Sequence, residues 1–226
     1  VTTVYPDPDP ETATVDGLVA RLVDGAPEAW GTLRGGAGTD ADPTAVTAYC
    51  ARVDAGGTAD TYGRLYRGGF LWDASSIPDT DTKDSATAEL FGNAKFNQLT
   101  STFTINMVSF APASNTNLVT GDYAIANWGS TLFATGITDA NWSITAYNVF
   151  TLNASGLANI SLTTVSKFGT RSEDDVNNVA PGGPFDGSAD AVSCQTAEAT
   201  GTANDPKLAV THTAAAAAFT PRAIFF

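Results

Sequence analysis

The stretch from residue 61 to residue 92 constrains the fold most, because its apolar side chains recur at every second position. The aromatic residues Tyr66, Phe70 and Trp72 fall on one face, which is the period of a β-strand. A loop of small polar residues follows, and the alternation returns over residues 85–91. Two amphipathic strands joined by a loop need a second sheet over their apolar face. We therefore predict an all-β fold, a single antiparallel β-sandwich of jelly-roll type.

The composition agrees with strands and excludes some partners. Apolar residues make up 43% of the 226 residues and charged residues only 15%, so long helices rich in Glu, Lys and Leu are not expected. The net charge of −13 argues against nucleic acid and against an anionic membrane surface as partners. No run of 18 apolar residues occurs, so no membrane insertion is expected.

The same sequence patterns predict one domain and the ranges of its other elements. We expect an extended N-terminal arm at residues 1–16, the sandwich at 17–213 and an apolar tail at 214–226, with one short helix at 156–163. Residues 171–190 are expected to form a long loop. Further strands are predicted at 17–22, 30–33, 45–53, 99–110, 123–133, 142–152, 191–196 and 207–211.

The acidic arm and the cysteines leave alternatives open. Carboxylates at Asp7, Asp9, Glu11 and Asp16 could converge on a structural calcium ion, although a solvated arm is favoured and no other cofactor is expected. With two cysteines and one histidine in the chain, zinc and thiol-redox sites are not expected. Cys50 and Cys194 form either one long-range disulfide or two separate buried thiols.

Groups that would support catalysis are few. A catalytic triad would have to use His212, which sits in the predicted last strand, and no nucleophile elbow is present. Glu173, Asp174 and Asp175 are adjacent, but consecutive acids point apart and are typical of a solvated loop. We therefore predict that the protein is not an enzyme.

Aromatic and apolar residues suggest two kinds of contact. Trp128 and Trp142, which neighbour Asn and Gly, are candidates for stacking on sugar rings, with core packing as the alternative. The tail residues Phe219, Ile224, Phe225 and Phe226 need a surface to lie on, either the protein's own sandwich or a neighbouring subunit. Together with Tyr5 of the arm, we assign these residues to assembly.

Several blocks resemble the DNRLRE-type β-sandwich modules. They are DGLVARL at 16–22, RLYRGGFLWDASSIP at 64–78, SATAELFG at 85–92, NVFTLNASGLANI at 148–160 and DPKLAVTHT at 205–213. These are mostly core and turn residues, so the resemblance implies the fold more than an activity. Ala88 and Lys83 depart from the family pattern, which affects the expected strand register.

The resemblance implies a structural or binding function. Such modules occur in secreted proteins as carbohydrate-binding or surface-attached units and in phages among virion structural genes. We expect a structural subunit of an extracellular assembly, such as a capsid decoration, tail or fibre protein, whose partners are its own copies and other structural proteins. A carbohydrate-binding module of a secreted protein is the alternative. The first residue is Val1 rather than Met, which suggests processing, and a removed signal peptide is one cause.

Overall fold

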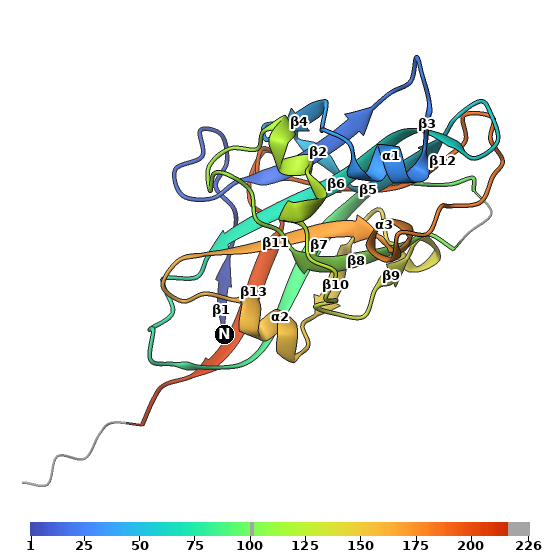
Figure 1. Ribbon diagram of the computed structural model, residues 1–226. Helices are drawn as coiled ribbons and strands as arrows, with labels where there is room; N and C mark the ends of the chain where they lie inside the picture. Colours follow the sequence, from blue (N-terminus) through green and yellow to red (C-terminus); the bar gives the residue numbers. More distant parts are fainter. Residues whose placement is uncertain (100–101, 217–226) are drawn as a thin grey trace, which may run out of the picture.

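The computed structural model describes residues 1–99 and 102–216, whose regular structure consists mainly of antiparallel strands (Figure 1). The strands of these residues are β1 (Thr2–Val4), β2 (Asp16–Leu22), β3 (Glu28–Ala29), β4 (Asp40–Asp42), β5 (Thr47–Ala55), β6 (Thr61–Asp73), β7 (Thr82–Asn97), β8 (Thr104–Ser109), β9 (Ile137–Thr138), β10 (Tyr147–Thr151), β11 (Val165–Ser172), β12 (Ala189–Gln195) and β13 (Lys207–Thr213).

Helices are short and lie between the strands. They are α1 (Trp30–Gly35), α2 (Ala154–Asn159), α3 (Glu173–Asn177) and the 3₁₀ turns η1 (Thr120–Tyr123), η2 (Ile125–Asn127) and η3 (Asp139–Asn141). Figure 1 shows α1 and α3 near one end of the molecule and β1 with the N-terminus toward the other.

Two long strands hold the architecture together. The first half of β7 pairs with β13 and β10, and its second half pairs with β12. Similarly, β6 pairs on one side with β5 and then with β11, while β2 lies along its other side. The sheet therefore curls, and Trp72, Phe168, Phe150 and Leu208 from its different parts share one buried core. The predicted all-β antiparallel sandwich is confirmed.

The sheet divides where β6 exchanges one neighbour for another. β5 pairs with β6 up to Arg67, and β11 pairs from Gly68 onward. The Cys50 carbonyl, left at the end of the β5 ladder, accepts a hydrogen bond from the Thr170 hydroxyl of β11 at 2.6 Å. A buried backbone acceptor without a partner is costly, so Thr170 closes the gap that the division creates.

Two segments predicted as strands are helical. Residues 30–33 begin α1, in which Trp30 and Leu33 are both buried. A spacing of three suits one face of a helix, and a segment this short does not distinguish the two periods. Residues 123–133 form turns rather than a strand: they include the end of η1 and all of η2. The buried Asp122 carboxylate just before them accepts hydrogen bonds from the backbone of Ala113 and Val119.

The N-terminal arm also differs from the prediction. Residues 2–4 form β1, which pairs with residues 208–210 of β13 in the same chain, so the first part of the arm belongs to the sheet. Residues 214–216 after β13 are exposed. The predicted assembly residues Phe219, Ile224, Phe225 and Phe226 lie outside the described residues.

We predict that Gly169→Ala destabilises the fold. A Cβ at Gly169 of β11 would lie 2.4 Å from ring atom Cζ3 of Trp128 and 3.0 Å from Cβ of Phe110. Such overpacking costs on the order of 1–3 kcal/mol. Urea unfolding measures the loss. The control Gly57→Ala meets no heavy atom within 4 Å and should stay within about 0.5 kcal/mol of the wild type. Equal stability of the two variants would contradict the close contact.

Candidate functional site

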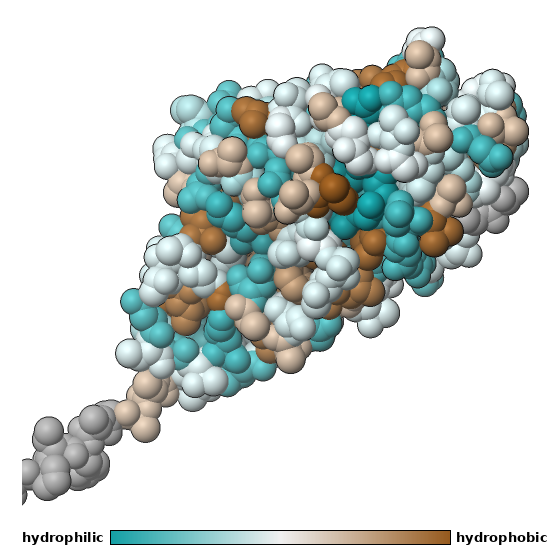
Figure 2. Space-filling view, viewed as in Figure 1, coloured by the Kyte–Doolittle hydropathy of each residue, from teal (hydrophilic) through white to brown (hydrophobic). Residues whose placement is uncertain are grey.

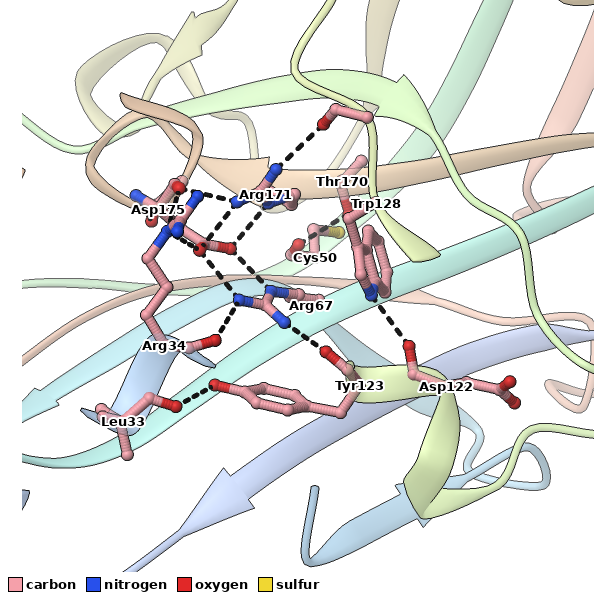
Figure 3. A network of polar contacts seen from close by, with 12 residues as sticks. Leu33, Arg34, Cys50, Arg67, Asp122, Tyr123, Trp128, Thr170, Arg171 and Asp175 are labelled. Atoms are coloured by element: carbon pink, nitrogen blue, oxygen red, sulfur yellow. Dashed lines mark hydrogen bonds and ion pairs between the residues drawn. The ribbon is translucent and has the colours of Figure 1, made fainter. Parts of the chain in front are cut away.

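The most concentrated group of charges is a buried ion network around Asp175 of α3 (Figure 3). Arg67 of β6 donates to its two carboxylate oxygens at 2.7 and 2.9 Å, and Arg171 of β11 donates to the same two oxygens at 2.8 and 2.9 Å. Arg34 of α1 adds a contact of 3.2 Å. Figure 3 shows the three guanidinium groups converging on this one carboxylate.

The remaining hydrogen-bond donors of the network bind backbone carbonyl groups. Arg67 also donates to Tyr123 O at 2.5 Å and lies over the Tyr123 ring, whose hydroxyl donates to Leu33 O at 2.8 Å. Arg171 donates to Gly129 O at 2.9 Å. Burial alone would raise the pKa of Asp175, but the charge of Arg67 and the hydrogen bonds from both arginines hold it well below its usual range.

This network joins distant segments rather than facing a ligand. The side chains of Arg67, Arg171 and Asp175 are at most 1% exposed, and only Arg34 reaches solvent, at 18%. Figure 2 shows hydrophilic surface over α1 and α3, with apolar residues scattered in small patches over this face. The expectation that Asp175 belongs to a solvated loop is wrong: Ser172 caps α3 through the Asp175 backbone N–H and turns the carboxylate inward.

The two tryptophans predicted to stack on sugars are buried. Trp128 is stacked on Phe110 with ring centroids 4.1 Å apart, and its Nε1 donates to Asp122 O at 2.9 Å. Trp142 is 1% exposed. Their ring faces are covered by the protein, so the structure supports the alternative of core packing and not glycan stacking at these positions.

The other predicted groups have local roles. Cys50 and Cys194 are free, fully buried thiols; burial first, and then the neighbouring Cys50 thiol, raise the pKa of Cys194 well above its usual value. His212 lies 2.7 Å from Asp81 and 3.0 Å from the Thr2 hydroxyl, at the β1–β13 edge. The ring thereby joins the Thr2 hydroxyl of β1 to the Asp81 carboxylate that precedes β7.

The arm carboxylates divide between a local turn and the region around Glu198. Asp7 accepts hydrogen bonds from the backbone of Thr12, Ala13 and Thr14 and thereby closes a turn. Glu11 and Asp16 lie near Glu198; burial raises the pKa of Glu198, and the charges of Glu11 and Asp9 add to that rise. Within residues 1–99 and 102–216, no group of three acidic, histidine or cysteine side chains is arranged to hold a metal ion.

A hollow on the opposite face of the sheet is the best candidate for a binding site. The register Arg52↔Tyr66 and Asp54↔Arg64 places these four side chains on one face, while the intervening Val53 and Leu65 point into the core. The hollow has a volume of about 360 Å³, and its rim includes the glycines Gly56, Gly57, Gly63 and Gly187.

Two bidentate ion pairs form its floor. Arg52 donates to the Asp54 carboxylate at 2.6 and 2.7 Å, and Arg64 donates to the Asp24 carboxylate at 2.6 and 2.5 Å. The hydrogen bonds from Arg64 lower the pKa of Asp24, so this carboxylate is ionised at neutral pH. Each ion pair holds its two side chains in a fixed orientation. The carboxylate acceptors and guanidinium donors of the floor therefore lie side by side in preorganised positions.

Aromatic rings support this floor. Tyr49 and Tyr66 lie 4.9 Å apart by ring centroid, and the Arg52 guanidinium lies over both, 4.8 and 5.6 Å from their centroids. Arg52 also donates to the Tyr49 hydroxyl at 2.6 Å. The rings therefore fix Arg52, and the groups left facing the hollow are polar.

Comparison with known proteins identifies no family. No protein-family model matches the chain, and a search of curated proteins finds no similar sequence. The DNRLRE-type resemblance therefore stays a prediction. Among the described residues, no helix is both long and apolar enough to cross a membrane.

We predict that Asp175→Asn destabilises the protein by about 3–5 kcal/mol at pH 7, because two buried guanidinium groups lose their counter-charge. Asp175 has a lowered folded pKa, so its contribution to the wild type is present above the unfolded value and is lost as pH falls below about 4. Urea unfolding at pH 7 and pH 3 should show a smaller difference between variant and wild type at pH 3. Glu173→Gln, at an exposed position of the same helix, is the control. A loss below about 1 kcal/mol at pH 7 would contradict the role of the network.

Proposed function

We propose that this protein is a non-enzymatic binding module that recognises a neutral saccharide in the hollow formed by Asp24, Arg52, Asp54 and Arg64. The observation that supports this proposal is that two bidentate ion pairs, Arg52–Asp54 and Arg64–Asp24, line one hollow. Sugar hydroxyls both donate and accept hydrogen bonds, so alternating carboxylate and guanidinium groups match them.

The charge pattern favours a neutral ligand over a charged one. Two arginines and two aspartates leave the floor without excess charge, and the chain as a whole carries a net charge of −13, which repels polyanions. Recognition would rest on hydrogen bonds, because Arg52 already covers the rings of Tyr49 and Tyr66. The glycines of the rim allow a ligand to approach the backbone closely.

Filling the hollow tests this proposal. Gly57 lies on the rim with open space around it, so Gly57→Trp should occupy the hollow without disturbing the core. We expect wild type and Gly57→Ala to bind the same neutral glycan on an array and in calorimetry, and Gly57→Trp to bind it at least about tenfold more weakly, a change of about 1.4 kcal/mol.

Asp24→Asn should also weaken binding, because the amide removes one acceptor and its ion pair with Arg64. Unfolding curves should be unchanged for Gly57→Trp. Equal affinity of Gly57→Trp and the wild type, or no binding to any neutral glycan, would overturn the proposal.

A second proposal is a structural subunit of an extracellular assembly such as a virion. It is supported by the sheet edge: β1 ends the strand order, Val1 and Tyr5 are 84% and 39% exposed, and β13 leads into the exposed residues 214–216. The apolar residues Phe219, Ile224, Phe225 and Phe226 follow in the sequence. Neighbouring copies would join by apolar docking or strand addition at this edge.

We predict that deleting residues 217–226 leaves a folded monomer and abolishes assembly. The core that the structure describes is built from residues between Val15 and Val210, so we expect the unfolding midpoint to be unchanged. Light scattering coupled to size-exclusion chromatography measures the oligomeric state. Gly57→Trp is the control, since it should assemble normally. Assembly of the truncated protein at wild-type concentration would contradict this second proposal.

A further inference from the structure

The N-terminal arm packs against the loop that follows β12. The two segments enclose a small hollow of about 160 Å³, lined by Tyr5, Pro6 and Pro8 of the arm and by Ala197, Ala199 and Asp205 of the loop, among others. Apart from the Asp205 carboxyl group, these side chains are apolar or aromatic. Water is therefore a poor partner for a charge placed in this contact.

Carboxyl groups nevertheless gather in and beside the contact. Glu11 of the arm, Asp16 at the start of β2, and Glu198 and Asp205 of the loop come from three segments. Four of their oxygens are buried without a hydrogen-bond partner: Oε1 of Glu11, both carboxylate oxygens of Glu198, and Oδ1 of Asp205. Asp205 is only 4% exposed and lines the hollow itself.

The acids lie near one another. The charges of Glu198 and Asp205 act on Asp16, and those of Glu11 and Asp9 act on Glu198. Asp16 is fully buried, and its carboxylate accepts a hydrogen bond from Ala197 N at 3.2 Å. The Thr196 hydroxyl, which lies beside Glu198, donates to the Ala45 carbonyl oxygen.

The basic residue near these acids forms an ion pair with another carboxylate and does not neutralise them. Lys207, two residues after Asp205, pairs with Glu89 at 3.1 Å and lies over the Tyr147 ring. Tyr147 donates its hydroxyl to the backbone oxygens of Ala203 and Asp205, not to the carboxylate. The thiol of Cys194 is the other titratable group that faces Asp16. In the described part of the chain, Glu11, Asp16, Glu198 and Asp205 take part in no ion pair.

We propose that the contact between the arm (residues 5–16) and the loop (residues 197–205) is a proton-dependent latch, closed while the carboxyl groups of Glu198 and Asp205 are protonated and opened when they ionise. A protonated carboxyl group is neutral and can donate a hydrogen bond to a neighbouring carboxyl oxygen. Ionised groups in the same place repel each other and need water, which reaches them only if the arm separates from the loop.

The titration lies in a range that proteins encounter. Burial raises the pKa of Glu198 to about 7 and the pKa of Asp205 to about 6, and burial together with the charge of Glu198 raises the pKa of Asp16 well above its usual value. A carboxyl group whose folded pKa is raised stabilises the closed contact fully below its unfolded pKa and loses that stabilisation as pH rises through the folded pKa. The closed contact should therefore lose stability between about pH 4, the ordinary carboxyl range, and about pH 7.

Hydrogen exchange of the full chain tests this latch. Protection of backbone amides in residues 11–16, corrected for the intrinsic pH dependence of exchange, should fall at least about tenfold between pH 5.5 and pH 8.5 in the wild type, which corresponds to one unit of pKa difference. In the combined variant Glu198→Gln/Asp205→Asn both amides stay neutral, so protection should change by less than about twofold over this range, and each single variant should show a smaller change than the wild type.

The same hydrogen-exchange experiment includes a control variant. Asp79→Asn removes an exposed acid and should keep the wild-type pH dependence. Wild-type protection that is independent of pH, or Glu198→Gln and Asp205→Asn variants with the wild-type dependence, would overturn the latch. Recovery of protection at pH 8.5 on adding 2 mM calcium chloride to the wild type would also overturn it, since the acids would then bind a cation rather than protons. The wild-type measurement does not depend on whether the variants fold.

Discussion

The contact between Asp175 and the two buried arginines is the interaction on which the other parts of the structure depend. Arg67, Arg171 and Asp175 come from β6, β11 and α3, and Arg34 adds α1, so one carboxylate ties together segments more than a hundred residues apart. Taking these charges out of water is costly, and only a geometry that satisfies all of them offsets that cost. The network therefore selects one arrangement of these segments against others with a similar apolar core.

The position of Arg67 links this network to the division of the sheet. Arg67 is the last residue of β6 paired with β5, and Gly68 is the first paired with β11. A Cβ at Gly68 would lie 2.6 Å from the Thr170 hydroxyl oxygen, so the absence of a side chain lets β11 approach at this point. Arg171 follows Thr170 on β11 and points to the same carboxylate as Arg67. The point at which β6 changes its pairing from β5 to β11 is therefore adjacent to the ion network.

Sequence reasoning could predict the elements that obey a single period. Alternation indicated most of β6 and β7 together with the all-β class, and short strand-like runs indicated most of β2, β5, β12 and β13. It failed at residues 30–33 and 123–133, where side-chain hydrogen bonds and a spacing of three decide the conformation. The burial of Trp128 and Trp142 depends on packing against distant residues such as Phe110, which periodicity does not report.

Part of the candidate hollow could be predicted from the sequence. Arg52 and Asp54, like Arg64 and Tyr66, stand two residues apart in otherwise apolar strands, which indicates a polar strip on one face. What the sequence could not supply was the register that sets Asp54 opposite Arg64, because register depends on the bulge between Asp54 and Ala55. The ion-pair partners of Asp175 could not be predicted either, because ion pairs between distant segments produce no periodic pattern in the sequence.

The scarcity of basic residues connects these features. The chain has 11 Lys and Arg against 24 Asp and Glu, and every arginine in the described residues lies within 4.0 Å of a carboxylate. Those of α1, β5, β6 and β11 form the buried network and the floor of the hollow, and Arg21 of β2 pairs with Glu28. The contact between the arm and the loop after β12 holds buried carboxyl groups without such a partner. Because arginine is permanently charged and a carboxyl group is not, the two regions respond differently to pH: the paired carboxylates stay ionised near neutrality, while the unpaired ones must exchange protons with the solvent.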